Sequence, residues 1–131
     1  IDTLVARVLA VVAGGAALVQ YRDKSAPDAE RRSRAAALVQ ACHAAGVPLI
    51  VNDSVTLAAV TGAAGVHLGR DDGPLADARA ALGNRAIIGV SCYDSLARAR
   101  DAVAAGADYV AFGSVYPSAT KPGAVRCPLE V

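Results

Sequence analysis

The sequence contains little or none of several residue types, and each shortage narrows what the protein can be. It has no methionine, and its first residue is Ile1. Because a complete translation product normally begins with methionine, we expect the 131 residues to be part of a longer protein. Aromatic residues make up only 4% of the chain, and alanine dominates its apolar residues. We therefore expect a core that consists of small aliphatic side chains.

Cysteines and long apolar segments are also scarce. The three cysteines, Cys42, Cys92 and Cys127, include no CxxC pair, so neither a zinc site nor a disulfide framework is predicted. Small buried thiols in a reducing cytoplasm are the expected alternative. The longest apolar run, residues 8–19, is too short to span a bilayer, and no signal-peptide pattern is present. The sequence therefore predicts a cytoplasmic protein.

Neither sign of charge is in excess. Lysine and arginine total 13 and aspartate and glutamate total 12, which gives a net charge of +1. A nearly neutral chain does not indicate a nucleic-acid or membrane surface, so neither partner is predicted. Whether the protein forms homo-oligomers is left open.

Short apolar segments alternate with segments of helical spacing along the whole chain. Glycine ends the helical segments in the repeated junctions AAGV, at 44–47 and 63–66, and AAGA, at 104–107. This alternation predicts a single α/β domain over residues 1–131, with a parallel sheet and right-handed crossovers. Periodicity alone does not separate a barrel from an open sheet. The expected strands are 17–22, 48–51, 66–69, 86–90 and 108–113, and the expected helices are 1–13, 25–45, 54–61, 75–82 and 94–105.

Two aspartates follow neighbouring strands in the stretch from residue 49 to residue 72. Asp53 ends the segment LIVND, and Asp72 follows the segment GVHLG. Because the carboxyl ends of parallel strands lie at one edge of a sheet, we expect the two carboxylates to approach each other, and a shared Mg²⁺ would offset their repulsion. The alternative is that both aspartates cap helices, as Ser25 and Asp94 are expected to do.

The other strand ends carry polar groups as well. Alternation by two places Gln20, Arg22 and Lys24 on one face, where an arginine and a lysine suit a phosphate or pyrophosphate. A solvated charged turn is the alternative. His67, inside GVHLG, fits a hydrogen-bonded core histidine better than a catalytic one. The remaining polar groups at strand ends are Asn52, Ser91, Ser118, Thr120 and Lys121.

The order and spacing of five segments resemble the bacterial thiamine phosphate synthase family. The segments are QYRDK (20–24), LIVND (49–53), GVHLGRDD (65–72), IIGVSCYD (87–94) and DYVAFGSVYPSATKP (108–122). The resemblance implies a TIM (β/α)8 barrel, of which this chain would contain about strands two to six. It also implies a Mg²⁺-dependent transferase of thiamine biosynthesis, which joins hydroxymethylpyrimidine pyrophosphate to a thiazole phosphate and releases pyrophosphate.

The resemblance also implies roles for individual residues. Asp53 and Asp72 would bind Mg²⁺, while Arg22, Lys24 and Lys121 would be catalytic by stabilising the leaving pyrophosphate. Ser118 stands where many relatives have threonine, which keeps the hydroxyl. The residues expected to contact the phosphorylated substrates are Gln20, Tyr21, Arg22, Asp23, Lys24, Asn52, Ser91, Ser118, Ala119, Thr120 and Lys121.

Two alternative functions stay open. The first is a thiazole tautomerase-like relative. It shares the barrel but does not use the complete set of site residues, namely the Asp-Asp pair and the Thr-x-Lys motif. The second is a non-catalytic protein that binds phosphorylated pyrimidine or thiazole ligands. Because the family's barrel is longer than 131 residues, we expect residues 1–131 alone to be inactive.

Overall fold

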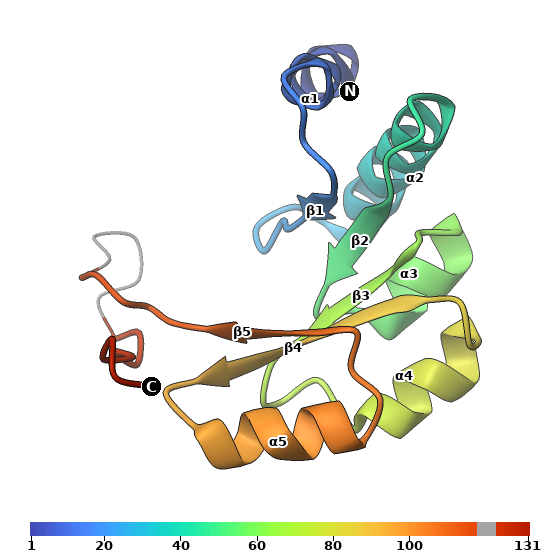
Figure 1. Ribbon diagram of the computed structural model, residues 1–131. Helices are drawn as coiled ribbons and strands as arrows, with labels where there is room; N and C mark the ends of the chain where they lie inside the picture. Colours follow the sequence, from blue (N-terminus) through green and yellow to red (C-terminus); the bar gives the residue numbers. More distant parts are fainter. Residues whose placement is uncertain (118–122) are drawn as a thin grey trace.

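The computed structural model describes residues 1–117 and 123–131, and helices alternate with strands from Asp2 to Phe112 (Figure 1). The chain begins with a helix, and each strand except the last is followed by a helix. In order, the elements are α1 (Asp2–Ala13), β1 (Val19–Tyr21), α2 (Asp28–Ala44), β2 (Leu49–Asn52), α3 (Val55–Thr61), β3 (Gly65–Leu68), α4 (Leu75–Leu82), β4 (Ile87–Tyr93), α5 (Leu96–Ala104) and β5 (Tyr109–Phe112).

The strands form one curved parallel sheet in the order β1-β2-β3-β4-β5. The helices lie side by side in an arc along one side of the sheet, as Figure 1 shows. On the other side, side chains from strands that are not neighbours meet, because the Tyr109 hydroxyl of β5 lies 2.7 Å from the His67 Nδ1 of β3. The fold is therefore a half-barrel with its helices outside, which confirms the predicted barrel family and the five parallel strands.

The core lies between the sheet and the helix arc, and small side chains bring the two layers together. Strands β2 and β3 are almost fully buried, as expected for parallel strands covered by helices. The helices α2 to α5 each bury at least one alanine against the sheet. This agrees with the prediction that the core consists of small aliphatic side chains. These alanines are Ala35, Ala58, Ala78, Ala99 and Ala102.

None of the four residues considered as helix caps in the sequence is a cap in the structure. Ser54, rather than Asp53, caps α3 by accepting a hydrogen bond from the Leu57 N–H at 3.1 Å. Ser95, rather than Asp94, caps α5 in the same way. Helix α2 begins after Pro27 without a side-chain cap, so the prediction for Ser25 was wrong. Helix α4 begins after Pro74, which leaves Asp72 free of a capping role.

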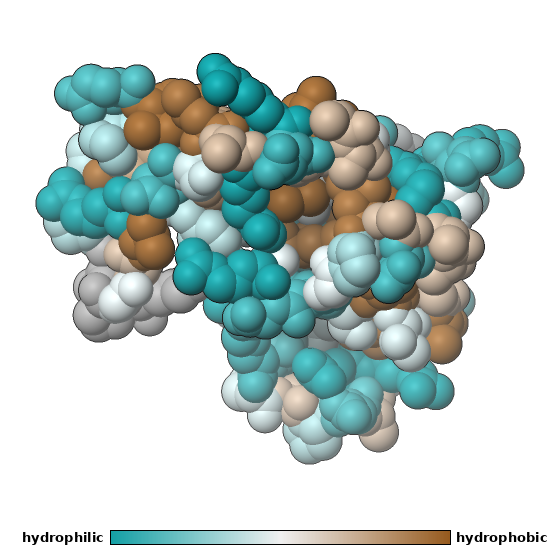
Figure 2. Space-filling model, turned by 90° about the horizontal axis from the view of Figure 1, so that it is seen from below, coloured by the Kyte–Doolittle hydropathy of each residue, from teal (hydrophilic) through white to brown (hydrophobic). Residues whose placement is uncertain are grey.

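Figure 2 shows the molecule from below the view of Figure 1, where α5 lies. On this face, separate hydrophobic patches lie among hydrophilic residues. Leu96 and Val103 of α5 are among the exposed apolar side chains. None of the helices in the described residues is long and apolar enough to cross a membrane. All three cysteines are buried, as predicted, and carry free thiols.

Candidate functional site

A polar cavity of about 350 Å³ lies at the carboxyl ends of the first four strands. Strands β1 to β4 and the loops that follow β1, β2 and β3 supply its walls. Parallel α/β folds bind their ligands at this end of the sheet. The lining residues are Gln20, Arg22, Lys24, Asn52, Asp53, His67, Gly69, Arg70, Asp71, Asp72, Ser91 and Tyr93.

The two predicted metal ligands lie together in this cavity. Asp53 has a positive φ of 66°, and its carboxylate lies 3.1 Å from the Lys24 Nζ. Asp72 is fixed by its own turn, because its Oδ2 accepts a hydrogen bond from the Gly69 N–H at 2.6 Å. Burial raises the pKa of Asp72, and the negative charge of Asp53 raises that pKa further. Asp53 and Asp72 therefore line the same cavity and interact through their charges.

These carboxylates fit a hard divalent cation. A cation between them would remove the repulsion that raises the pKa of Asp72. In the described residues no group of three or more histidine, cysteine or acidic side chains is placed to hold a metal. Mg²⁺ is commonly bound by two protein carboxylates, while water or substrate oxygens occupy its other coordination positions. Asp53 and Asp72 would be the protein ligands.

His67 is buried beneath the cavity and uses both ring nitrogens in hydrogen bonds, as the core interpretation predicted. Its Nδ1 lies 2.7 Å from the Tyr109 hydroxyl, and its Nε2 lies 2.8 Å from the Ser91 Oγ. Burial lowers the pKa of His67, although the charges of Asp53 and Asp72 oppose this. A neutral imidazole with one donor and one acceptor therefore orients the Ser91 hydroxyl at the cavity wall.

The Tyr109 ring reaches His67 because β4 has a glycine beneath it. A Cβ atom on Gly89 would lie 2.0 Å from the Cζ of Tyr109, far inside van der Waals contact. Gly89 is therefore required by packing. The sequence analysis assigned no role to Gly89 or Tyr109, because their contact joins residues from different strands.

An arginine and a tyrosine form the side of the cavity nearest β5. The guanidinium of Arg70 lies 4.4 Å from the centre of the Tyr93 ring, and the backbone N–H of Arg70 donates a hydrogen bond to the Tyr93 hydroxyl. Arg98 of α5 donates from Nε to the Ser91 carbonyl at 2.7 Å. Arg70 and Tyr93 also line a neighbouring cavity of about 430 Å³. The sequence analysis did not identify Arg70 or Tyr93 as site residues. Their positions just after β3 and at the end of β4 could have indicated them, because polar residues at strand ends line the cavity.

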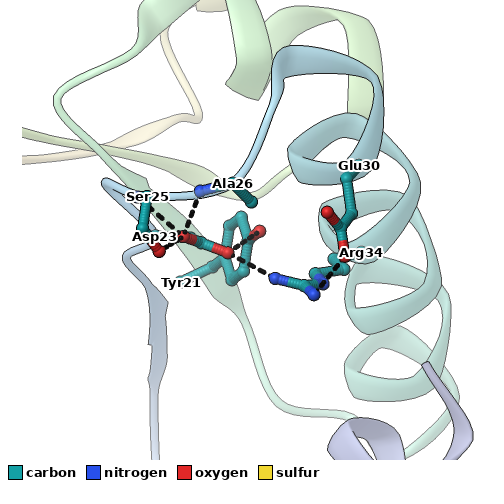
Figure 3. Close-up of polar contacts among 6 residues, drawn as sticks. All are labelled: Tyr21, Asp23, Ser25, Ala26, Glu30 and Arg34. Atoms are coloured by element: carbon teal, nitrogen blue, oxygen red, sulfur yellow. Dashed lines mark hydrogen bonds and ion pairs between the residues drawn. The ribbon is translucent and has the colours of Figure 1, made fainter.

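The side chains at the end of β1 and in the loop after it face two different sides of the sheet. Arg22 and Lys24 line the cavity with Gln20, as the period of two predicted. Tyr21 and Asp23 do not line it: Tyr21 is buried in the core, and Asp23 contacts Arg34 of α2 (Figure 3). A contiguous motif therefore contains residues that face opposite sides of the sheet.

The remaining predicted residues divide between the cavity and the part of the chain outside the described residues. Asn52 and Ser91 line the cavity. Ser118, Ala119, Thr120 and Lys121, expected to contact phosphate groups, lie outside the described residues.

Fold and site together define a class: a parallel half-barrel with a charged cavity at the carboxyl ends of its strands. A family model described as thiamine monophosphate synthase matches residues 1–131. The chain therefore belongs to the thiamine monophosphate synthase family.

Individual relatives and a solved structure agree with this assignment. The chain is 58% identical over 129 residues to the thiamine-phosphate synthase of Methylococcus capsulatus, covering 98% of this chain and 58% of that protein. It is 60% identical over 131 residues to that of Thioalkalivibrio sulfidiphilus, covering 100% and 62%. The structure of a thiamine phosphate pyrophosphorylase from Pyrococcus furiosus superposes with a TM-score of 0.83 at 36% identity, covering 96% of this chain and 59% of that one. The chain thus spans about 60% of the length of these relatives.

Proposed function

We propose that the full-length protein is a thiamine phosphate synthase. It would join hydroxymethylpyrimidine pyrophosphate to a thiazole phosphate and release pyrophosphate. The observation that carries this proposal is the meeting of Arg22 and Lys24 with Asp53 and Asp72 in one cavity at the strand ends. Relatives that share 58% and 60% identity bear the name of this activity. The buried free cysteines fit the cytoplasm as its compartment.

The reaction needs positive charge more than it needs a base. The bond between the pyrimidine methylene carbon and the pyrophosphate oxygen breaks, and its electron pair leaves with the pyrophosphate. The thiazole nitrogen then attacks the resulting carbocation. Arg22 and Lys24, and Lys121 by its motif, would stabilise the negative charge that develops on the leaving group. The ion pair between Lys24 and Asp53 is exposed and worth at most about 1 kcal/mol, so Lys24 can turn to a bound anion.

The metal would act on the same leaving group. When bound, Mg²⁺ would neutralise charge on the pyrophosphate oxygens. Asp53 and Asp72 would hold it, with the Gly69 N–H keeping the Asp72 carboxylate in position. His67 would not serve as a general base, because both of its nitrogens are already engaged. It would instead hold the Ser91 hydroxyl towards the substrate.

The direct test is product formation by the purified full-length protein. With both substrates and Mg²⁺, we expect thiamine phosphate and pyrophosphate in equal amounts. A tautomerase-like relative would instead isomerise its thiazole substrate, and a non-catalytic protein would bind either substrate without turnover. Either of these results would contradict the proposal.

A further inference from the structure

Asp23 lies between two cavity-lining cations but faces away from them. Its neighbours Arg22 and Lys24 are exposed at the cavity, whereas its own side chain is only 13% exposed. A substrate contact was expected of this residue from the motif QYRDK. The geometry of its carboxylate indicates a different task.

One oxygen of Asp23 holds the backbone of its own loop. Its Oδ1 accepts hydrogen bonds from the Ser25 N–H and the Ala26 N–H, both at 3.1 Å, and from the Ser25 hydroxyl at 3.2 Å. Such a side-chain turn fixes the residues that lie between the acceptor and the donors. The residue enclosed by this turn is Lys24, whose ammonium group reaches Asp53.

The other oxygen ties the loop to a rigid element. Arg34 of α2 donates from Nη1 to the Asp23 Oδ2 at 2.7 Å, and its Nη2 binds Glu30 one helical turn away (Figure 3). The Tyr21 hydroxyl lies 3.5 Å from the same Oδ2. Hydrogen bonds from Ala26 and Ser25 lower the pKa of Asp23 to about 2, so this carboxylate is charged at neutral pH.

We propose that Asp23 is a positioning residue: anchored by Arg34, it shapes the loop after β1 so that Arg22 and Lys24 face the cavity. The identity of the anion that these cations meet rests on the function proposed above. Asp23 itself touches no substrate. The loop is held on the side opposite the cavity, so ligand binding leaves this anchor intact.

The test uses the full-length protein and varies each substrate separately. Asp23→Ala should lower kcat/KM for the pyrimidine pyrophosphate by about 10- to 100-fold, since small misplacements of charged groups have effects of this size. The KM for the thiazole phosphate should change by less than about twofold, because the loop holds groups for the pyrophosphate. An equal effect on both substrates would overturn the proposal.

A double-mutant cycle shows whether Asp23 acts through its neighbours. In a background of Arg22→Ala and Lys24→Ala, the further change Asp23→Ala should cost less than about threefold in rate, because nothing remains to be positioned. The full factor in both backgrounds would contradict the proposal. If Asp23→Ala does not fold, Arg34→Met replaces it: Arg34→Met should lose rate, and Arg34→Lys, which keeps the charge, should recover most of it. Equal rates for these two variants would also contradict the proposal.

A matched control lies at the other end of the sheet. Asp108 likewise accepts a backbone hydrogen bond, from the Ile88 N–H at 2.7 Å, and pairs with Arg79 at 2.9 Å. Asp108→Ala should lower the melting temperature and leave kcat/KM within about twofold of the wild type, since it holds no cavity residue. Loss of rate in Asp108→Ala as large as in Asp23→Ala would reduce Asp23 to a general stabilising role.

Calorimetric binding of magnesium pyrophosphate separates this proposal from the proposed function. If the wild type binds magnesium pyrophosphate but makes no thiamine phosphate, only the function is overturned. Asp23→Ala should then still bind at least about tenfold more weakly than the wild type. Equal dissociation constants would overturn the positioning role, and absence of binding by the wild type would overturn both.

Discussion

The contact between Gly89 and Tyr109 gives a prediction whose size follows from the structure. In Gly89→Ala, the added methyl group would lie 2.0 Å from the Tyr109 Cζ and 2.4 Å from its hydroxyl oxygen. Because carbon atoms normally stay about 3.5–4.0 Å apart, the ring must move away from His67. The forced repacking costs about 1–3 kcal/mol, and a His67 nitrogen left without its partner costs about 1–3 kcal/mol more.

Thermal denaturation of the full-length protein, followed by circular dichroism, measures this effect. We expect Gly89→Ala to lose about 2–6 kcal/mol of unfolding free energy and at least about 5 °C of melting temperature. Gly123→Ala is the control, since a Cβ atom there meets no atom of the described residues within 4 Å. In a Tyr109→Ala background, Gly89→Ala should be neutral or slightly stabilising, because the obstructing ring is gone. An unchanged melting temperature for Gly89→Ala, or the same loss in both backgrounds, would refute the reasoning.

Three further predictions follow from the site and its surroundings. Arg22→Ala and Lys121→Ala should each lower kcat at saturating pyrimidine substrate by about two to three decades while changing stability little; near-full rates would show that neither acts on the pyrophosphate. Ser95→Ala should destabilise the protein by about 0.5–2 kcal/mol in chemical denaturation and Asp94→Ala much less, and the reverse order would contradict the assigned cap. Since the folded-state pKa of Asp23 is depressed to about 2, its stabilising effect is complete above the unfolded pKa near 4 and is lost as the pH falls towards 2. Wild type should therefore lose more stability than Asp23→Asn between pH 4 and 2, and parallel acid titrations of the two would contradict this.

Local patterns in the sequence were sufficient to predict the elements and much of the cavity. Glycines at helix ends and continuous apolar runs predicted the alternation that forms the half-barrel. Because strand side chains alternate, the spacing of Gln20, Arg22 and Lys24 placed all three on the cavity side. Asp53 and Asp72 could be brought together because neighbouring parallel strands end at the same edge.

What the sequence could not predict depends on register and on distant contacts. Asp94 and Ser95 are both good caps, and only the starting residue of α5 decides between them. Tyr21 and Asp23 were assigned to the site as members of a contiguous motif, although alternation turns them towards α2. The partner of Asp23, Arg34, lies eleven residues away on a helix, where no local rule identifies it.

The most direct test of the proposed site is the Mg²⁺ dependence of the rate in Asp53→Asn. Asp53→Asn removes one of two carboxylates that would share the ion, so the Mg²⁺ concentration for half-maximal rate should rise by about tenfold or more. Asp94→Asn, which changes an exposed carboxylate in another strand-end loop outside the cavity, should leave that concentration unchanged. A Mg²⁺ requirement of Asp53→Asn equal to that of the wild type would contradict the assignment of this cavity as the metal-dependent pyrophosphate site.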